Sequence, residues 1–221
     1  MKKIILASTL SLCVASAFAA DTAVLKVTGK LTNASCSPEL SNGGVIDYGP
    51  VHLGLLSPTE VNQLGEKGIN LTITCSAPTL VGWVANDNRT SSVAGIAVDY
   101  YGEMSNLPYY EYGVGKTTNG VNIGNYYISI KNKKVTIDGK EGDGIDSNTD
   151  WNGTTWKAGS GVRSDGVTIV SAATAGTLTP VAFTTAVFPL STLLAIQGTD
   201  TLAITDDTPL DGQATITLKY L

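Results

Sequence analysis

The chain has 221 residues, enough for one ordinary domain with a sizeable core. Apolar residues make up 43% of it and charged residues only 15%, which excludes a disordered chain and disfavours a helical bundle, so an all-β domain is expected. The formal net charge of −5 makes nucleic acid and anionic lipid surfaces poor partner candidates.

The first residues are typical of a secretory signal peptide. Lys2 and Lys3 precede an apolar run, and Ala17-Phe18-Ala19 supplies the small residues that signal peptidase requires. We therefore expect residues 1–19 to be removed, and the protein to be exported to the periplasm or the cell surface. Beyond this segment no apolar run reaches the ~18 residues needed to span a bilayer, so no membrane span is expected.

Two cysteines remain after the signal peptide, Cys36 and Cys75. In an oxidising compartment they should form a disulfide, which would stabilise the fold by roughly 4 kcal/mol on the chain-entropy model. Metal ligation or a thiol nucleophile is disfavoured because His52 is the only histidine in the chain.

Period-two alternation predicts half-buried strands. It is cleanest over 25–31 and 69–75, and further strands are expected at 79–85, 95–101, 126–131, 167–171, 181–187, 202–205 and 213–221. Turn residues such as Asp138-Gly139 and Asp211-Gly212 separate them, which favours a β-sandwich formed by residues 20–221. The best short helix candidate is Pro189–Gln197. Residues 99–165 are rich in Gly, Tyr and Asn and are expected to form long loops.

No catalytic or metal-binding pattern is complete. The segment Gly113–Thr117 ends like a phosphate loop, but the required earlier Gly is Tyr110. The acidic run from Asp138 to Asp150 lacks the spacing of a calcium loop and is interpreted as a solvated loop. We therefore expect no enzyme activity, cofactor or metal.

Aromatic residues in the middle of the chain are candidates for glycan contact, because flat apolar rings with polar tips suit the C–H face of a sugar. The candidates are Tyr109, Tyr110, Trp151 and Trp156. Packing of these rings under long loops is the alternative interpretation.

Both ends of the chain after the signal peptide resemble the subunits of chaperone–usher fimbriae. The likeness rests on Val27–Cys36, Asp47-Tyr48-Gly49 and the closing Ala214–Leu221 with its penultimate tyrosine. The blocks Cys36–Gly49, Asp87–Arg89 and Leu210–Ala214 resemble, more narrowly, a family of pilin-related periplasmic proteins of unknown function.

This resemblance implies an immunoglobulin-like, pilin-type β-sandwich that lacks its last strand and needs a donated one. It also implies a structural or adhesive role in a fimbria-like surface assembly, with a periplasmic chaperone, an outer-membrane usher and other fimbrial subunits as partners. The terminal strand would contact the chaperone or the donated strand through Gly212, Ala214, Ile216, Leu218, Tyr220 and Leu221.

The N-terminal segment has two interpretations. Ala23, Leu25, Val27, Gly29 and Leu31 form either the first strand of the protein itself or a donor for another subunit. We favour the first strand, because unbroken alternation leaves no hinge. The alternative to an assembly subunit is a free-standing periplasmic carbohydrate-binding module that binds a host or surface glycan.

Overall fold

The structure is a computed structural model that describes residues 25–29, 35–148 and 155–221. The chain divides into two units, Met1–Asn33 and Ala34–Leu221. The expected signal peptide, residues 1–19, lies outside the described residues. Within the described part of the chain no helix is long and apolar enough to cross a membrane.

Leu25–Gly29 is not in a strand, in contrast to our expectation for this segment, and the other two residues of the expected strand, Ala23 and Leu31, lie outside the described residues. The side chains of Leu25 and Val27 are 89% and 88% exposed. The first strand begins instead at Cys36, which lies opposite Cys75. The disulfide between these two cysteines, which the sequence predicts, is confirmed. The disulfide fixes the strand that begins at Cys36 to the sheet. The segment 25–29 is therefore not needed as a first strand.

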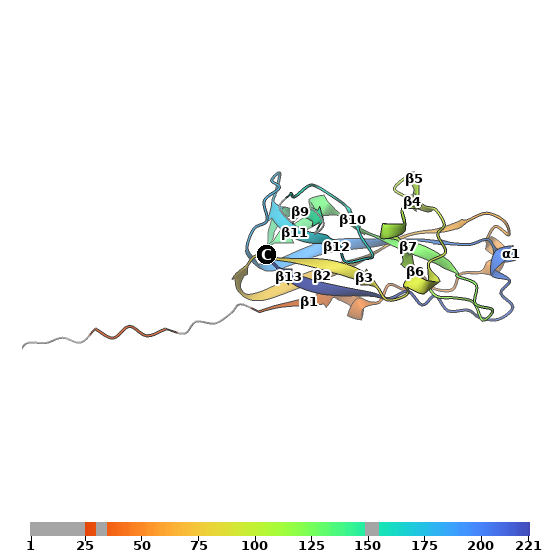
Figure 1. Cartoon of the computed structure of the whole chain (residues 1–221), viewed down its shortest axis with the longest axis horizontal. Helices are drawn as coiled ribbons and strands as arrows, with labels where there is room; N and C mark the ends of the chain where they lie inside the picture. The colour runs from red at the N-terminus through yellow and green to blue at the C-terminus, as the bar shows by residue number, and fades with distance from the viewer. Residues whose placement is uncertain (1–24, 30–34, 149–154) are drawn as a thin grey trace, which may run out of the picture. The chain divides into compact units, whose positions relative to one another are not determined.

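Eleven of the described strands join one antiparallel sheet (Figure 1). Its main path runs in the order β1 (Cys36–Leu40), β2 (Asn62–Thr79), β12 (Phe183–Ile196), β8 (Val135–Ile137), β9 (Lys140–Asn148), β11 (Thr168–Thr174), β3 (Val81–Asp87) and β13 (Ala214–Tyr220). Strand β7 (Gly124–Ile130) also pairs with β12, and it carries β6 (Tyr112–Gly113) and β10 (Gly161–Val162). The all-β class expected from the composition is confirmed.

The remaining elements are short. Strands β4 (Val98–Tyr100) and β5 (Glu103–Ser105) form a separate hairpin, and the helical turns are η1 (Ser41–Gly44), η2 (Leu53–Leu55), η3 (Thr90–Ser92), η4 (Pro108–Tyr110), η5 (Asn132–Lys134) and α1 (Thr199–Leu202). The region 99–165, expected as long loops, thus carries strands β5 to β10 in its described part.

The main core lies inside the curved sheet. In β2, alternate residues Leu71, Ile73 and Cys75 are buried, as period two predicts. They pack in one cluster with Trp83 of β3 and Phe188 of β12, whose rings meet edge to face with centroids 5.9 Å apart. Strands far apart in the sheet order therefore share one core, and the sheet is nearly closed.

The helix expected at Pro189–Gln197 is wrong, because this segment is the second half of the 14-residue strand β12. β12 pairs with β2 on one side and with β7 on the other. Both of its faces are covered here, so Leu193 and Leu194 are both buried and the apolar residues do not alternate.

A second, smaller cluster covers the outer face of β7 and β12. It contains Val98, Tyr127, Leu193 and Ala195, with Tyr100 packed against it. The hairpin β4–β5 thus packs on the outside of the sheet, away from the main core.

Candidate functional site: an open groove between β1 and β13

The two ends of the sheet, β1 and β13, face a single gap. They touch at one end, where the Cys36 N–H donates a hydrogen bond to the Tyr220 hydroxyl at 2.9 Å. Along the rest of their length a groove opens between them, with Leu40 of β1 and both Ala214 and Ile216 of β13 among its lining residues. We call this the β1–β13 groove.

The β13 edge of the groove offers a row of backbone groups that are unpaired among the described residues. Gln213 accepts from the Asn88 N–H and Leu221 donates to the Leu80 carbonyl, so odd-numbered residues of β13 carry the hydrogen bonds to β3. In an antiparallel ladder the intervening residues point their N–H and C=O groups to the opposite side. These are Ala214, Ile216, Leu218 and Tyr220, and they face the gap.

The β1 edge offers far fewer donors. The Ser76 N–H donates to the Ser35 carbonyl, so the even-numbered residues of β1 face the gap. Of these, Cys36 already donates to Tyr220, and Pro38 has no N–H. Leu40 is the one residue of β1 with a free N–H toward the gap. A strand placed in the groove would therefore form most of its hydrogen bonds with β13.

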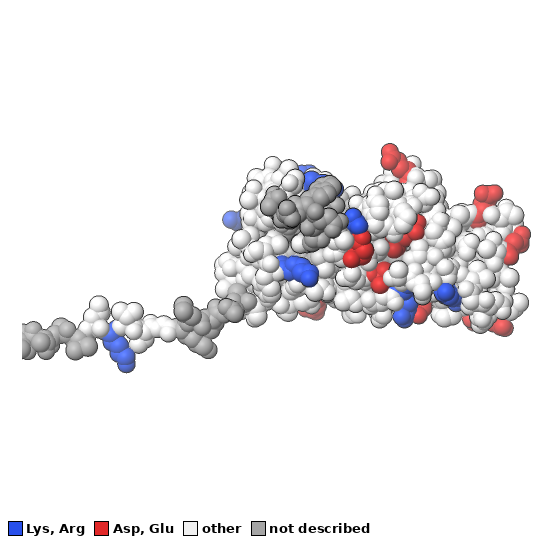
Figure 2. Space-filling view, viewed as in Figure 1, with Lys and Arg blue, Asp and Glu red and all other residues white. Residues whose placement is uncertain are grey.

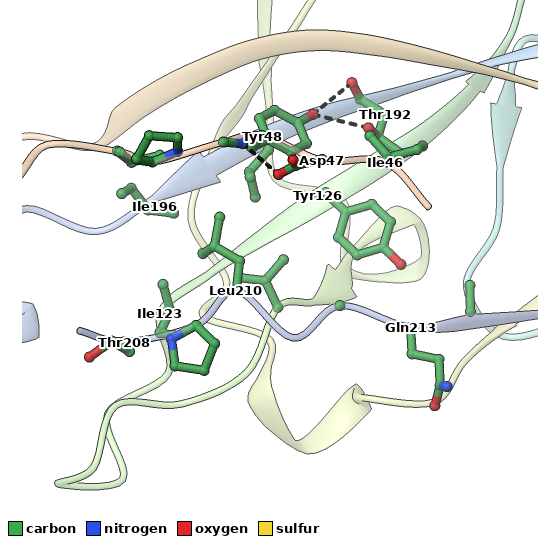
Figure 3. Close-up of a pocket in the computed structure, with 18 of the residues that line it drawn as sticks. Ile46, Asp47, Tyr48, Ile123, Tyr126, Thr192, Ile196, Thr208, Leu210 and Gln213 are labelled. Carbon is green, nitrogen blue, oxygen red and sulfur yellow. Dashed lines mark hydrogen bonds between the residues drawn. The ribbon is translucent and has the colours of Figure 1, made fainter. Parts of the chain in front are cut away.

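The groove is large and mainly apolar, with a volume of about 1020 Å³ (Figure 3). Its floor comes from β7 and β12, which contribute Tyr126, Ile128, Leu190 and Leu194. Leu210, from the segment before β13, points into it beside Ile123 (Figure 3). The apolar floor and the unpaired edge together match the needs of an extended strand with apolar residues at alternate positions.

Tyr48 fixes the extended segment that forms the wall next to β1. Its hydroxyl lies 3.0 Å from the Thr192 hydroxyl and donates to the Thr192 carbonyl at 3.1 Å (Figure 3). Burial raises the pKa of this hydroxyl, so it stays protonated at neutral pH. The neighbouring Asp47 carboxylate accepts from the Gly49 N–H at 2.7 Å. This wall is therefore held in place without any occupant.

Charged groups lie around the groove and not on its floor. Asp47, Asp206 and Asp207 are among the lining residues, and within the described residues no Lys or Arg lines the groove. His52 also lines it, with an exposed side chain. The surroundings favour an occupant that carries positive charge on its outward face.

The residues predicted to form the contact surface of the terminal strand lie in different places in the structure. Gly212, Ala214 and Ile216 line the groove, and Leu218 packs against the main core. Tyr220 closes the end of the groove through Cys36, and Leu221 extends the pairing to Leu80. Gly212 is required for space, because a Cβ there would lie 2.9 Å from the Tyr126 ring.

The candidate glycan residues lie elsewhere. The rings of Tyr109 and Tyr110 meet with centroids 4.8 Å apart, and Tyr109 is 40% exposed. Trp156 is half-buried, and among the described residues no ring contact joins it to the tyrosines. Trp151 lies outside the described residues. The structure therefore keeps Tyr109 and Tyr110 together but apart from the groove.

Sequence reasoning missed most of the groove floor. Leu190, Thr192, Leu194 and Ile196 all line it from β12. Their period of two is visible in the sequence, but apolar residues at 193 and 195 obscure it. The segment around Ile46 was also missed, since it has no strand pattern of its own.

Comparison with known proteins places the chain in a family. The model of the family described as "Protein of unknown function (DUF1120)" matches residues 25–127. The chain is 32% identical to "Protein GltF" of Escherichia coli (strain K12) over an alignment that covers 97% of this chain and 95% of GltF. The chain belongs to the DUF1120 family. It is also 33% identical to "Uncharacterized protein YhcF" of the same organism over 55% of each chain.

The DUF1120 match spans several walls of the groove. Residues 25–127 include β1, the Tyr48 wall and Tyr126, whereas β13 lies outside the matched range. The alignment with GltF covers nearly the whole chain and so extends to β13 as well. The names of these two relatives state no activity.

Proposed function

We propose that this protein is a structural subunit of a fimbria-like surface assembly and that it associates by strand complementation. The observation that supports this most strongly is the β1–β13 groove, where an unpaired β13 edge lies above an apolar floor. An unprotected edge of this kind is otherwise a liability for a β protein. In this proposal the fold is an immunoglobulin-like, pilin-type sandwich with one strand position left open.

The chain contains a segment that fits the groove of another copy. Leu25 and Val27 alternate with Lys26 and Thr28, and both apolar side chains are almost fully exposed. Inserted as a strand, such a segment would place its apolar residues on the groove floor and Lys26 outward, near the acidic residues Asp206 and Asp207. We therefore assign the N-terminal segment the role of donor, in place of a first strand.

A chaperone or another subunit would use the same groove before or during assembly. Figure 2 shows that uncharged residues make up most of the face seen in Figure 1, which fits association through backbone pairing and apolar contact. The proposal places the protein in the periplasm or at the cell surface, with a periplasmic chaperone, an outer-membrane usher and other subunits as partners.

Hydrogen exchange of β13 tests the proposal residue by residue. The probe is a synthetic peptide with the sequence of residues 23–31, added to a full-length variant with Leu25→Asp and Val27→Asp, which keeps the groove but cannot donate. We expect the amides of Ile216 and Leu218, which face the gap, to become protected when the peptide binds. The amides of Thr215 and Thr217, paired with β3, should be slow from the start.

The matched control is Thr28→Asp, which adds the same charge on the other face of the donor. A peptide with this change should still bind, whereas a peptide with Val27→Asp should not, because it would bury an unpaired charge. Equal protection of the even and odd amides before the peptide is added, or no gain in protection of the even amides with the unmodified peptide, would contradict strand complementation.

A further inference from the structure

A second pocket lies on the outer face of the sheet, beside the β4–β5 hairpin, and shares only Leu194 with the lining of the β1–β13 groove. It has a volume of about 220 Å³, and its floor comes from Leu193 of β12 and Gly65 of β2. Gly65 sits at a β-bulge, where the pairing of β2 with β12 shifts between Leu194 and Ala195. Bulges are common next to binding sites because they redirect side chains. We call this space the Tyr101 pocket.

One wall is the Glu66 side chain, which Lys131 holds in place from outside the pocket. A Glu66 carboxylate oxygen accepts from the buried Ser191 hydroxyl at 2.5 Å and from the Lys131 ammonium at 2.7 Å. These donors hold the pKa of Glu66 below its usual value, so the carboxylate is charged at neutral pH. The second carboxylate oxygen has no partner among the described residues and remains an acceptor.

The opposite wall is fixed by backbone contacts. The Gln63 side chain donates to the Ala97 carbonyl at 2.9 Å and accepts from the Asp99 N–H at 2.9 Å. The Asp99 carboxylate in turn accepts from the Gly102 N–H at 2.6 Å. Both side chains are therefore positioned before any ligand binds, which lowers the entropic cost of binding.

Tyr101 supplies an aromatic ring at the rim. It occupies the β4–β5 turn with φ 57°, in the left-handed region that non-glycine residues rarely adopt. Its ring packs against Tyr100 with centroids 5.0 Å apart, yet the side chain remains 51% exposed. Its hydroxyl has no hydrogen-bond partner within the described part of the chain. A strained residue that presents a large exposed ring is a reason to look for a ligand.

We propose that the Tyr101 pocket binds one pyranose ring of a glycan, with Tyr101 as the stacking surface. The two carboxylates of Glu66 and Asp99, the Gln63 amide and the Tyr101 hydroxyl suit a neutral ligand with many hydroxyls that both donate and accept. The carboxylates of Glu66 and Asp99 disfavour an anionic ligand, and the polar walls disfavour an apolar one. The volume lies below the about 300–1,000 Å³ typical of drug-sized ligands, so one sugar ring is the fitting size.

The test is an NMR titration of the full-length protein with the methyl α- and β-pyranosides of glucose, galactose, mannose and N-acetylglucosamine. We expect at least one of them to bind with a Kd of about 1 mM and to shift the amide signals of Asp99, Tyr101 and Glu66. Tyr101→Asn removes the ring while Asn tolerates the left-handed conformation, and it should weaken binding about tenfold or more.

The matched control is Tyr109→Ala, which removes another exposed tyrosine outside the pocket and should leave binding unchanged. Glu66→Gln keeps the shape of the wall but removes its charge, and it should weaken binding without changing the stacking surface. Binding that is lost with Tyr109→Ala but kept with Tyr101→Asn would overturn the proposal, as would the absence of any shift with all these pyranosides. None of these outcomes depends on the β1–β13 groove, so the two proposals fail separately.

Discussion

Removal of the disulfide should destabilise the protein by about 4 kcal/mol. The bond joins Cys36 and Cys75, 39 residues apart in the sequence, and a cross-link that closes a loop of this length lowers the conformational entropy of the unfolded chain and so raises its free energy by about that much. The double variant with Cys36→Ala and Cys75→Ala avoids a free thiol. For a chain of this size the loss corresponds to a fall in Tm of roughly 8–16 °C.

The structure adds a local consequence. β1 pairs with β2 over only five residues, and the disulfide is its one covalent tie to the sheet. Without it the β1 wall of the groove should loosen, and the donor peptide of residues 23–31 should bind more weakly. Tyr220 would also lose a fixed partner, because its hydroxyl accepts from the Cys36 N–H.

Urea unfolding followed by circular dichroism measures the stability, and thiol counting on the native protein measures the bond. The wild type in the presence of reductant should have the same unfolding free energy and the same m-value as the double variant. A loss of less than about 1 kcal/mol would refute the reasoning, because it would mean that the unfolded chain gains little freedom when the bond is absent.

Three further predictions concern other parts of the sheet. Gly82→Ala should reduce the unfolding free energy by about 1–3 kcal/mol, because the new Cβ would lie 2.6 Å from the Val170 carbonyl oxygen of β11. The control is Gly54→Ala, where the new Cβ would meet no atom within 4 Å, and it should change the unfolding free energy by no more than about 0.5 kcal/mol. Burial raises the pKa of Asp146, whose Oδ1 has no hydrogen-bond partner among the described residues, so the folded state favours the protonated form and loses stability as pH rises above the ordinary value of 3.8. Asp146→Asn should accordingly raise Tm at pH 7 but not near pH 3, and a gain that is equal at both pH values would contradict this. The Lys133 ammonium donates to a carboxylate oxygen of Asp143 at 2.7 Å and lowers the pKa of this carboxyl. Lys133→Met should therefore reduce the unfolding free energy by less than about 1 kcal/mol above pH 4, and should leave it unchanged at pH 2, where the carboxyl is protonated. Thermal scans at the two pH values would show the difference.

The sequence predicts those strands that bury one face. Leu71, Ile73 and Cys75 alternate with polar residues, and Ile216 and Leu218 do the same at the end of the chain, so both strands and their inward faces follow from period two. The disulfide follows from the two cysteines that remain after the expected signal peptide and from the oxidising compartment that such a peptide implies. For the groove, the sequence reveals the β13 wall alone, through this terminal alternation.

Other parts depend on tertiary pairing that no local pattern records. β12 is paired along both edges, and side-chain clusters bury both faces of its second half, so this half looks like a short apolar helix in the sequence. Leu25 and Val27 have the alternation of a strand but no partner strand among the described residues, because alternation reports a preference for burial and not where burial occurs. The Tyr101 pocket arises from a bulge at Gly65 and a left-handed turn, and neither has a sequence signal of its own.

The single gap in the sheet limits how many partners can add to it. The path of paired strands begins at β1 and ends at β13, and both of these edges border the same groove. One inserted strand therefore uses up the β13 edge, and Pro38 and the Tyr220 contact leave few backbone donors on the β1 side of the same groove. In the assembly proposed above, each molecule would offer one acceptor groove and one donor segment, an arrangement that gives linear chains and works against sideways growth into an aggregated sheet.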